Sequence, residues 1–130
     1  MKLYRFLFLA GLIFMTFSSV NAHEIRPGFL QIEQINKSTY NVFWKIPRLG
    51  DAIPKIYVNF PDTFKVTELN RPNPIPGFVL YAYQINSNTP LNGQTIAIDG
   101  LSKTLIDVLV NINFLNGGNG GCISRRSTNA

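Results

Sequence analysis

Apolar and polar residues alternate along most of the chain after residue 28. This alternation is typical of β-strands that bury one face, and clusters of proline, glycine, asparagine and aspartate interrupt it as turns do. The pattern predicts strands over residues 29–35, 39–46, 55–60, 64–69, 78–85, 94–98 and 105–114. We therefore expect about seven short strands, arranged as an all-β antiparallel β-sandwich that follows an N-terminal signal helix.

The first two predicted strands form a hairpin, because only the short turn Asn36-Lys37-Ser38 separates them. Four apolar side chains share one face of the second strand: Tyr40, Val42, Trp44 and Ile46. Since the alternation assigns this face to the core, Trp44 is predicted to be a buried core residue. Pro47 ends the strand, because proline has no N–H group to donate to a neighbouring strand.

Three later stretches carry further structural predictions. Residues 70–77 hold three prolines and are predicted to be an extended connection that crosses between the two sheets. Residues 78–85 are the longest apolar strand, which we expect to lie centrally and to be covered on both faces. In residues 108–114 the alternation is strict, so four side chains are predicted to face inward: Val108, Val110, Ile112 and Phe114.

Residues 1–22 have the pattern of a secretory signal peptide. Lys2 and Arg5 precede an apolar run over residues 6–17, and small or polar residues follow up to Ala22. The apolar run is shorter than the roughly 20 residues that span a bilayer, so cleavage after Ala22 is favoured over a permanent anchor. We expect a periplasmic or otherwise extracytoplasmic protein, which stays tethered to the membrane if the signal is not cleaved.

After the signal, the chain divides into a β-sandwich domain over residues 23–115 and a tail over residues 116–130. Glycine and asparagine dominate the start of the tail and its end has no apolar pattern, so we expect it to be disordered. Cys122 is the only cysteine and lies in this tail, so no internal disulfide can form. A domain that ends on a core strand and then on such a tail also suggests a truncated protein.

The net charge of +5 does not indicate nucleic-acid binding. Four cationic residues belong to the signal or the tail: Lys2, Arg5, Arg125 and Arg126. Without them the net charge is about +1, and the remaining lysines and arginines are dispersed along the chain. Because phosphate recognition needs a basic patch, we expect no nucleic-acid partner.

His23 is the only histidine and becomes the first residue if the signal is cleaved. Its free amino nitrogen and its Nδ1 would then form a chelate suited to Cu²⁺ or Ni²⁺, and Glu24 would supply a nearby carboxylate. Two nitrogens do not complete a coordination sphere, and there is no second histidine. We therefore favour a protein without a cofactor, in which His23 simply follows the cleavage site, and keep nickel or copper binding as the alternative.

Arg26 and Asp107 are charged residues in otherwise apolar, strand-like surroundings. Because buried charges are normally paired, we interpret them as a partly buried ion pair that joins the first strand to the last. A surface that meets a membrane partner is the alternative interpretation of the same two residues.

Five aromatic residues are candidates for a sugar-binding surface: Tyr40, Trp44, Tyr57, Tyr81 and Tyr83. Packing in the core and across strands explains such residues more often, and we favour it here. Catalysis has little support, because the sequence contains no Ser-His-Asp order, no glycosidase-like carboxylate pair and no phosphate-binding loop. We expect a protein that is not an enzyme, and identify no small-molecule substrate.

Three blocks of sequence resemble the HupE/UreJ-like membrane proteins. These blocks are His23-Glu24-Ile25-Arg26-Pro27-Gly28-Phe29-Leu30, Tyr40-Asn41-Val42-Phe43-Trp44-Lys45-Ile46-Pro47, and Asp99-Gly100-Leu101 with Thr104 and Asp107-Val108-Leu109-Val110. Together they cover most of residues 23–115 and resemble the N-terminal extracytoplasmic domain of that family. The resemblance implies an accessory domain linked to nickel or cobalt uptake, here without the transmembrane helices. The family's cysteine pair, near the positions of Phe64 and Asn86, is missing, so its disulfide is not implied.

We favour an exported, non-enzymatic β-sandwich that contacts a membrane transporter partner or presents metal to it. Two alternatives stay open: a free-standing periplasmic copper- or nickel-binding protein that uses His23, and a truncated remnant without a function of its own. Apolar helices encoded downstream in another reading frame would indicate that a frameshift produced the short form.

Mass spectrometry and metal titration of the exported protein test the signal peptide and the chelate together. We expect a mass that starts at His23, and the chelate hypothesis predicts sub-micromolar Cu²⁺ or Ni²⁺ binding in calorimetry that His23→Ala abolishes. Such a mass without metal binding favours the interaction domain, whereas an uncleaved mass removes the free amino group. Folding of the His23→Ala variant is expected to be unchanged under each hypothesis.

Overall fold

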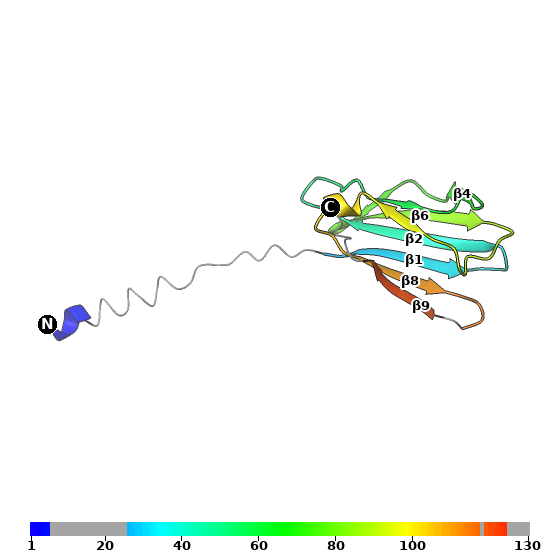
Figure 1. Cartoon of the computed structure of the whole chain (residues 1–130). Coiled ribbons are helices and arrows are strands. Elements are labelled where there is room, and N and C mark those ends of the chain that lie inside the picture. The colour runs from blue at the N-terminus through cyan, green and yellow to red at the C-terminus, as the bar shows by residue number, and fades with distance from the viewer. Residues whose placement is uncertain (6–25, 118, 125–130) are drawn as a thin grey trace.

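The structure is a computed structural model that describes residues 1–5, 26–117 and 119–124 (Figure 1). Residues 2–5 are helical; the rest of the predicted signal peptide, with His23 and Glu24, lies outside the described residues. Within the described part, no helix is long and apolar enough to cross a membrane. Cleavage after Ala22 stays a prediction.

Besides the helical residues 2–5, the described residues form nine strands and one short 3-10 helix, which confirms the predicted all-β class. Each predicted strand range overlaps one strand, whereas β5 and β9 were not predicted. The elements are β1 (Gly28–Gln34), β2 (Thr39–Pro47), β3 (Tyr57–Asn59), β4 (Lys65–Glu68), β5 (Asn73–Ile75), β6 (Phe78–Asn86), β7 (Ala97–Asp99), η1 (Leu101–Lys103), β8 (Val108–Asn113) and β9 (Asn119–Ser124).

The strands form two sheets that face each other, as in a sandwich with layers of unequal size (Figure 1). The main sheet has the order β4-β6-β2-β1-β8-β9, and β5 also pairs with β6. The small sheet consists of β3 and β7, and β7 (yellow in Figure 1) crosses one face of the main sheet. We call this covered side of the main sheet the inner face, and the opposite side the outer face.

One strand pair corrects the predicted antiparallel arrangement. β1 and β8 pair in parallel, whereas the other strand pairs are antiparallel. The cause is the path of the chain, which leaves β6, crosses the inner face through β7 and η1, and returns to the end at which β1 starts. Such a crossover delivers a strand parallel to its neighbour. Residues alternate in the same way in both kinds of pair, so the period-two pattern did not reveal the direction.

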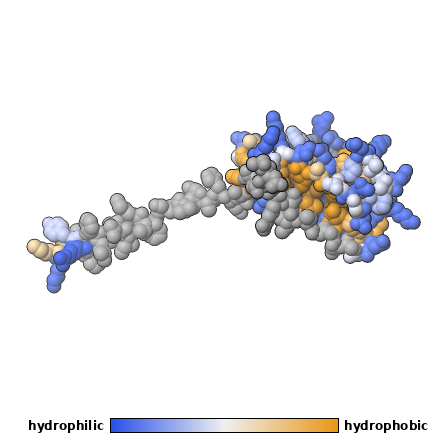
Figure 2. All heavy atoms as spheres, in the orientation of Figure 1, coloured by the Kyte–Doolittle hydropathy of each residue, from blue (hydrophilic) through white to orange (hydrophobic). Residues whose placement is uncertain are grey.

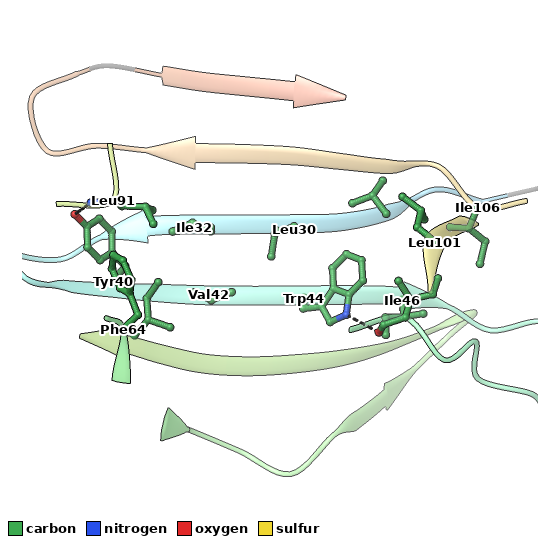
Figure 3. Close-up of a cluster of buried hydrophobic side chains, with 13 residues drawn as sticks. Leu30, Ile32, Tyr40, Val42, Trp44, Ile46, Phe64, Leu91, Leu101 and Ile106 are labelled. Atoms are coloured by element: carbon green, nitrogen blue, oxygen red, sulfur yellow. Dashed lines mark hydrogen bonds between the residues drawn. The ribbon is translucent and has the colours of Figure 1, made fainter. Parts of the chain in front are cut away.

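The core lies between the inner face and a second layer, which consists of the small sheet and the segments that adjoin it (Figure 3). Trp44 is 2% exposed, so its predicted core position is confirmed, and its Nε1 donates a hydrogen bond of 3.4 Å to the carbonyl oxygen of Ile56. Near the other end of β2, the Tyr40 hydroxyl accepts a hydrogen bond of 3.2 Å from the backbone N–H of Leu91. These two bonds attach the second layer near opposite ends of β2.

The second layer leaves parts of the inner face less covered. Several hydrophobic residues of the main sheet are only partly buried against the core: Tyr81, Tyr83, Val110 and Ile112. Figure 2, which has the orientation of Figure 1, shows hydrophobic atoms that reach the surface in the middle of the domain, with hydrophilic atoms around them. A small sheet of three-residue strands is too short to cover a sheet whose longest strands have nine residues.

The proline-rich connection was predicted to cross between the two sheets, and this prediction is wrong. The connection forms β5 and stays in the main sheet. β5 turns at Gly77, whose φ of 76° suits glycine, and pairs with the start of β6. An edge strand tolerates Pro74, because it has a neighbouring strand on one side only and the missing N–H group can lie on the other side, where no ladder hydrogen bond is lost. β6 lies inside the sheet, but the outer side chains Phe78 and Leu80 are only half-buried, so the prediction of coverage on both faces is wrong.

The prediction of a disordered tail is wrong for residues Asn119–Ser124, because they form β9 and pair antiparallel with β8. The turn is closed by a hydrogen bond of 3.1 Å from the N–H of Gly117 to the carbonyl oxygen of Phe114. Asn116-Gly117 is a hairpin signal in the sequence, and the glycine-rich composition that follows obscured it. Residues 125–130 lie outside the described part of the chain.

We expect Trp44→Ala to lower the free energy of unfolding by about 3–5 kcal/mol, because it leaves a cavity in the core and an unpaired carbonyl at Ile56. Leu105→Ala is the control: Leu105 is 70% exposed, and its truncation should change stability by less than about 0.5 kcal/mol. Chemical denaturation measures both. Equal effects of the two variants would contradict the assignment of Trp44 as a core residue.

Candidate functional site

The metal ligands predicted at His23 and Glu24 lie outside the described residues. Within the described part of the chain, no group of three or more histidine, cysteine, aspartate or glutamate residues could hold a metal ion. Nickel or copper binding by the N-terminus therefore stays a prediction.

Arg26 and Asp107 are both exposed, so the prediction of a partly buried pair is wrong. Backbone groups join β1 to β8 instead. The N–H of Gly28 donates to the carbonyl oxygen of Asp107 at 2.8 Å, and the hydrogen bonds of the β1–β8 ladder follow. The Arg26 guanidinium lies over the ring of Phe78, 6.0 Å from its centroid. Arg26 thus belongs to the outer face, where β6 begins.

The five candidate aromatic residues divide into two groups. Tyr40 and Trp44 are buried in the core, as the packing interpretation predicted. Tyr57, Tyr81 and Tyr83 line a cleft of about 400 Å³ between the inner face and the segment that begins at Ile56. We call this feature the tyrosine cleft. Its size lies within the range of small-molecule sites.

Strand register explains why the main sheet contributes two tyrosines to the tyrosine cleft. Tyr81 is paired with Trp44 and Tyr83 with Val42, so both tyrosines point to the inner face. Their rings are nearly parallel, with an interplanar angle of 11° and centroids 6.3 Å apart. Trp44 and Phe64 also line the cleft, and so does Tyr57 of β3, which is 61% exposed.

The tyrosine cleft has an acidic character. Asp62 is the one charged residue among those that line it, and neither lysine nor arginine does so. Glu68 lies directly opposite Tyr83 on β4, on the same face of the sheet. The pKa of Tyr83 is raised above the ordinary value of 10.0, first by burial and then by the negative charge of Glu68 and by Tyr81.

The outer face carries a second cluster of aromatic and apolar residues at the end where β1 begins. A cross-strand row runs from Leu109 through Phe29 and Lys45 to Leu80. Lys45 Nζ lies 5.0 Å from the ring centroid of Phe29 and 4.4 Å from that of Phe78, and the two ring centroids are 6.4 Å apart. We call the cluster formed by Phe29, Lys45, Phe78, Leu80 and Leu109 the outer patch.

The other end of the outer face is polar. Three side-chain hydrogen bonds lie there: Gln31 to Glu33 at 2.6 Å, Thr39 to Asn86 at 2.8 Å and Gln84 to Asn41 at 3.3 Å. Along the outer face, an apolar end is therefore followed by a polar one. Phe29 and Leu109 remain 36% and 37% exposed at the apolar end.

Comparison with protein-family models, with curated proteins and with solved structures found no match for this chain. The structure itself shows an all-β, sandwich-like domain. The tyrosine cleft and the outer patch are its two candidate sites.

Sequence reasoning missed the outer patch and did not place the tyrosine cleft. A signal for the outer patch existed, because Phe29 and Leu109 occupy strand positions that the alternation assigns to solvent. The tyrosine cleft needed knowledge of the second layer, since only the fold brings Tyr57 to within one cleft of Tyr81 and Tyr83.

We expect Glu68→Gln to lower the pKa of Tyr83 toward its ordinary value without reaching it, because burial is the larger cause of the shift and remains. Since folding raises this pKa, the stability it contributes is complete below about pH 10 and is lost as the pH rises through the folded-state value. NMR titration of labelled tyrosine rings measures the effect. Glu33→Gln, on the outer face, is the control, and an equal change in that variant would contradict the assignment.

Proposed function

We propose that this protein is an exported, non-enzymatic accessory domain that binds a membrane protein through its outer patch. The observation that carries the proposal is the exposure of Phe29 and Leu109 on adjacent strands of a sheet face that no other described layer covers, beside Phe78 and Lys45. The signal-peptide pattern of residues 1–22 supports export. The resemblance to the extracytoplasmic domain of HupE/UreJ-like proteins supports an accessory role beside a nickel or cobalt transporter.

The chemistry of the outer patch suits a protein partner. Specific interfaces combine an apolar, aromatic centre with a polar rim, and here Gln31, Glu33 and Asn111 extend the apolar end into a polar region. Lys45 lies over the ring of Phe78, so its charge is available to an acidic partner while its stem covers apolar surface. An exposed aromatic cluster of this kind is where binding energy concentrates.

The position of the outer patch fits a membrane partner. The patch lies at the end of the sheet at which β1 starts, and this is where residues 26 and 27 lead into the domain. If the signal is retained as a tether, this end of the domain is the one nearest the bilayer. A partner in the membrane would then meet the outer patch before the polar end.

Site-specific photo-crosslinking in the native host tests the proposal. A photoreactive residue in place of Leu109 is expected to give one discrete product that contains an integral membrane protein, identified by mass spectrometry. The matched control replaces Leu105, which is also an exposed leucine but lies outside the outer patch. Adding Phe29→Ser to the Leu109 probe should reduce the product several-fold. Equal products from both positions, or none from position 109, would overturn the proposal.

A further inference from the structure

The tyrosine cleft differs from the rest of the protein in combining aromatic walls with negative charge. Five aromatic residues line it, namely Trp44, Tyr57, Phe60, Tyr81 and Tyr83, and its one charged lining residue is Asp62. Glu68 adds a second carboxylate opposite Tyr83. Aromatic rings carry negative charge on their faces, so rings and carboxylates favour the same kind of ligand.

The polar groups of the cleft divide into those that are engaged and those that a ligand can use. The Trp44 N–H is bonded to Ile56, and the Asn59 side chain donates to Asp99. Among the described residues, the hydroxyls of Tyr57, Tyr81 and Tyr83 form no hydrogen bond, and Asp62 forms no ion pair with lysine or arginine. A ligand therefore meets aromatic rings, phenol hydroxyls and a carboxylate.

We propose that the tyrosine cleft binds a small alkylated ammonium ion, of the trimethylammonium type found in choline, against the Tyr81–Tyr83 pair with Asp62 at its rim. Such a cation is weakly hydrated and is attracted by the faces of aromatic rings, which is how aromatic cages recognise it. This inference does not rest on the proposed function, because the outer patch lies on the opposite face of the main sheet.

The same lining argues against two other ligand classes. An anion such as a phosphate would need cationic donors, and neither lysine nor arginine lines the cleft. A sugar needs several hydrogen-bonding side chains beside an aromatic ring, and here, apart from the tyrosine hydroxyls, only Asp62 is left for it because Asn59 is engaged. The sugar interpretation of these tyrosines is therefore less favourable than a cation.

The protein carries its own reporter for the test. Trp44 is the only tryptophan of the chain and lines the cleft, so its fluorescence responds to a bound ligand. The probe is choline chloride, and the control ligand is its uncharged isostere with a tert-butyl group in place of trimethylammonium. We expect a saturable response to choline and about tenfold weaker binding of the isostere, since the two ligands share shape but not charge.

Variants locate the site. Tyr83→Leu should weaken choline binding about tenfold while Tyr83→Phe, which keeps the ring, retains most of it. Asp62→Asn should weaken binding and reduce its dependence on salt. Phe29→Leu and Asp107→Asn are the matched controls, because they remove a ring and a carboxylate outside the cleft and should leave binding unchanged. Circular dichroism checks that each variant is folded.

Each result decides the inference. Equal binding of choline and its isostere would show a merely apolar cleft, and undiminished binding by Tyr83→Leu would place the ligand elsewhere; either overturns the proposal. Binding of neutral monosaccharides without binding of choline also overturns it. If choline binds as expected, competition by phosphatidylcholine vesicles distinguishes a lipid headgroup from a free soluble cation as the source. Photo-crosslinking from the outer patch is unaffected by any of these outcomes.

Discussion

The position of the second layer depends on the contact between Trp44 and the backbone at Ile56. Trp44 lies on β2, in the middle of the main sheet, and its buried N–H group would be costly without an acceptor. The hydrogen bond to Ile56 therefore fixes the point at which the chain begins to cross the inner face. The indole also restricts its neighbour on β1, because a Cβ at Gly28 would lie 3.3 Å from Cη2 of Trp44. One side chain thus sets both the packing of the sheet and the start of the second layer.

This attachment also explains why a cleft exists. After Ile56 the chain forms only three residues of β3 before it turns back toward the main sheet at Phe64, which is buried and packs edge-on against Tyr40. The second layer is therefore anchored at Ile56 and at Phe64, and residues 57–62 between the two anchors line the cleft together with Tyr81 and Tyr83 of β6. Tyr81 and Tyr83 lie beneath that span and remain partly exposed. The cleft therefore exists because the second layer is attached at Ile56 and Phe64 and is too short between them to cover Tyr81 and Tyr83.

The local alternation of residues predicted where the strands lie. It did not predict the features that depend on pairing between distant segments. The alternation along β2 placed Trp44 correctly, because one buried face imposes a period of two whatever the neighbours are. The parallel β1–β8 pair, the exposed position of Arg26 and Asp107, and the placement of Tyr57 and Tyr83 along one cleft all depend on contacts between distant segments. Composition misled at β5 and β9, where proline and glycine favour a loop but an edge position still permits a strand.

The two aromatic surfaces differ in whether the protein supplies its own cation. On the outer face, Lys45 lies over Phe29 and Phe78, and Arg26 lies over Phe78, so those rings already interact with a positive charge of the chain. In the tyrosine cleft no lysine or arginine is among the lining residues, while the charge of Glu68 makes the surroundings of Tyr83 more negative. A cation–π contact needs a ring and a desolvated cation, and the cleft offers the ring alone. The outer patch is thus prepared to meet an extended apolar and acidic surface, whereas the cleft is prepared to receive the missing charge from a ligand.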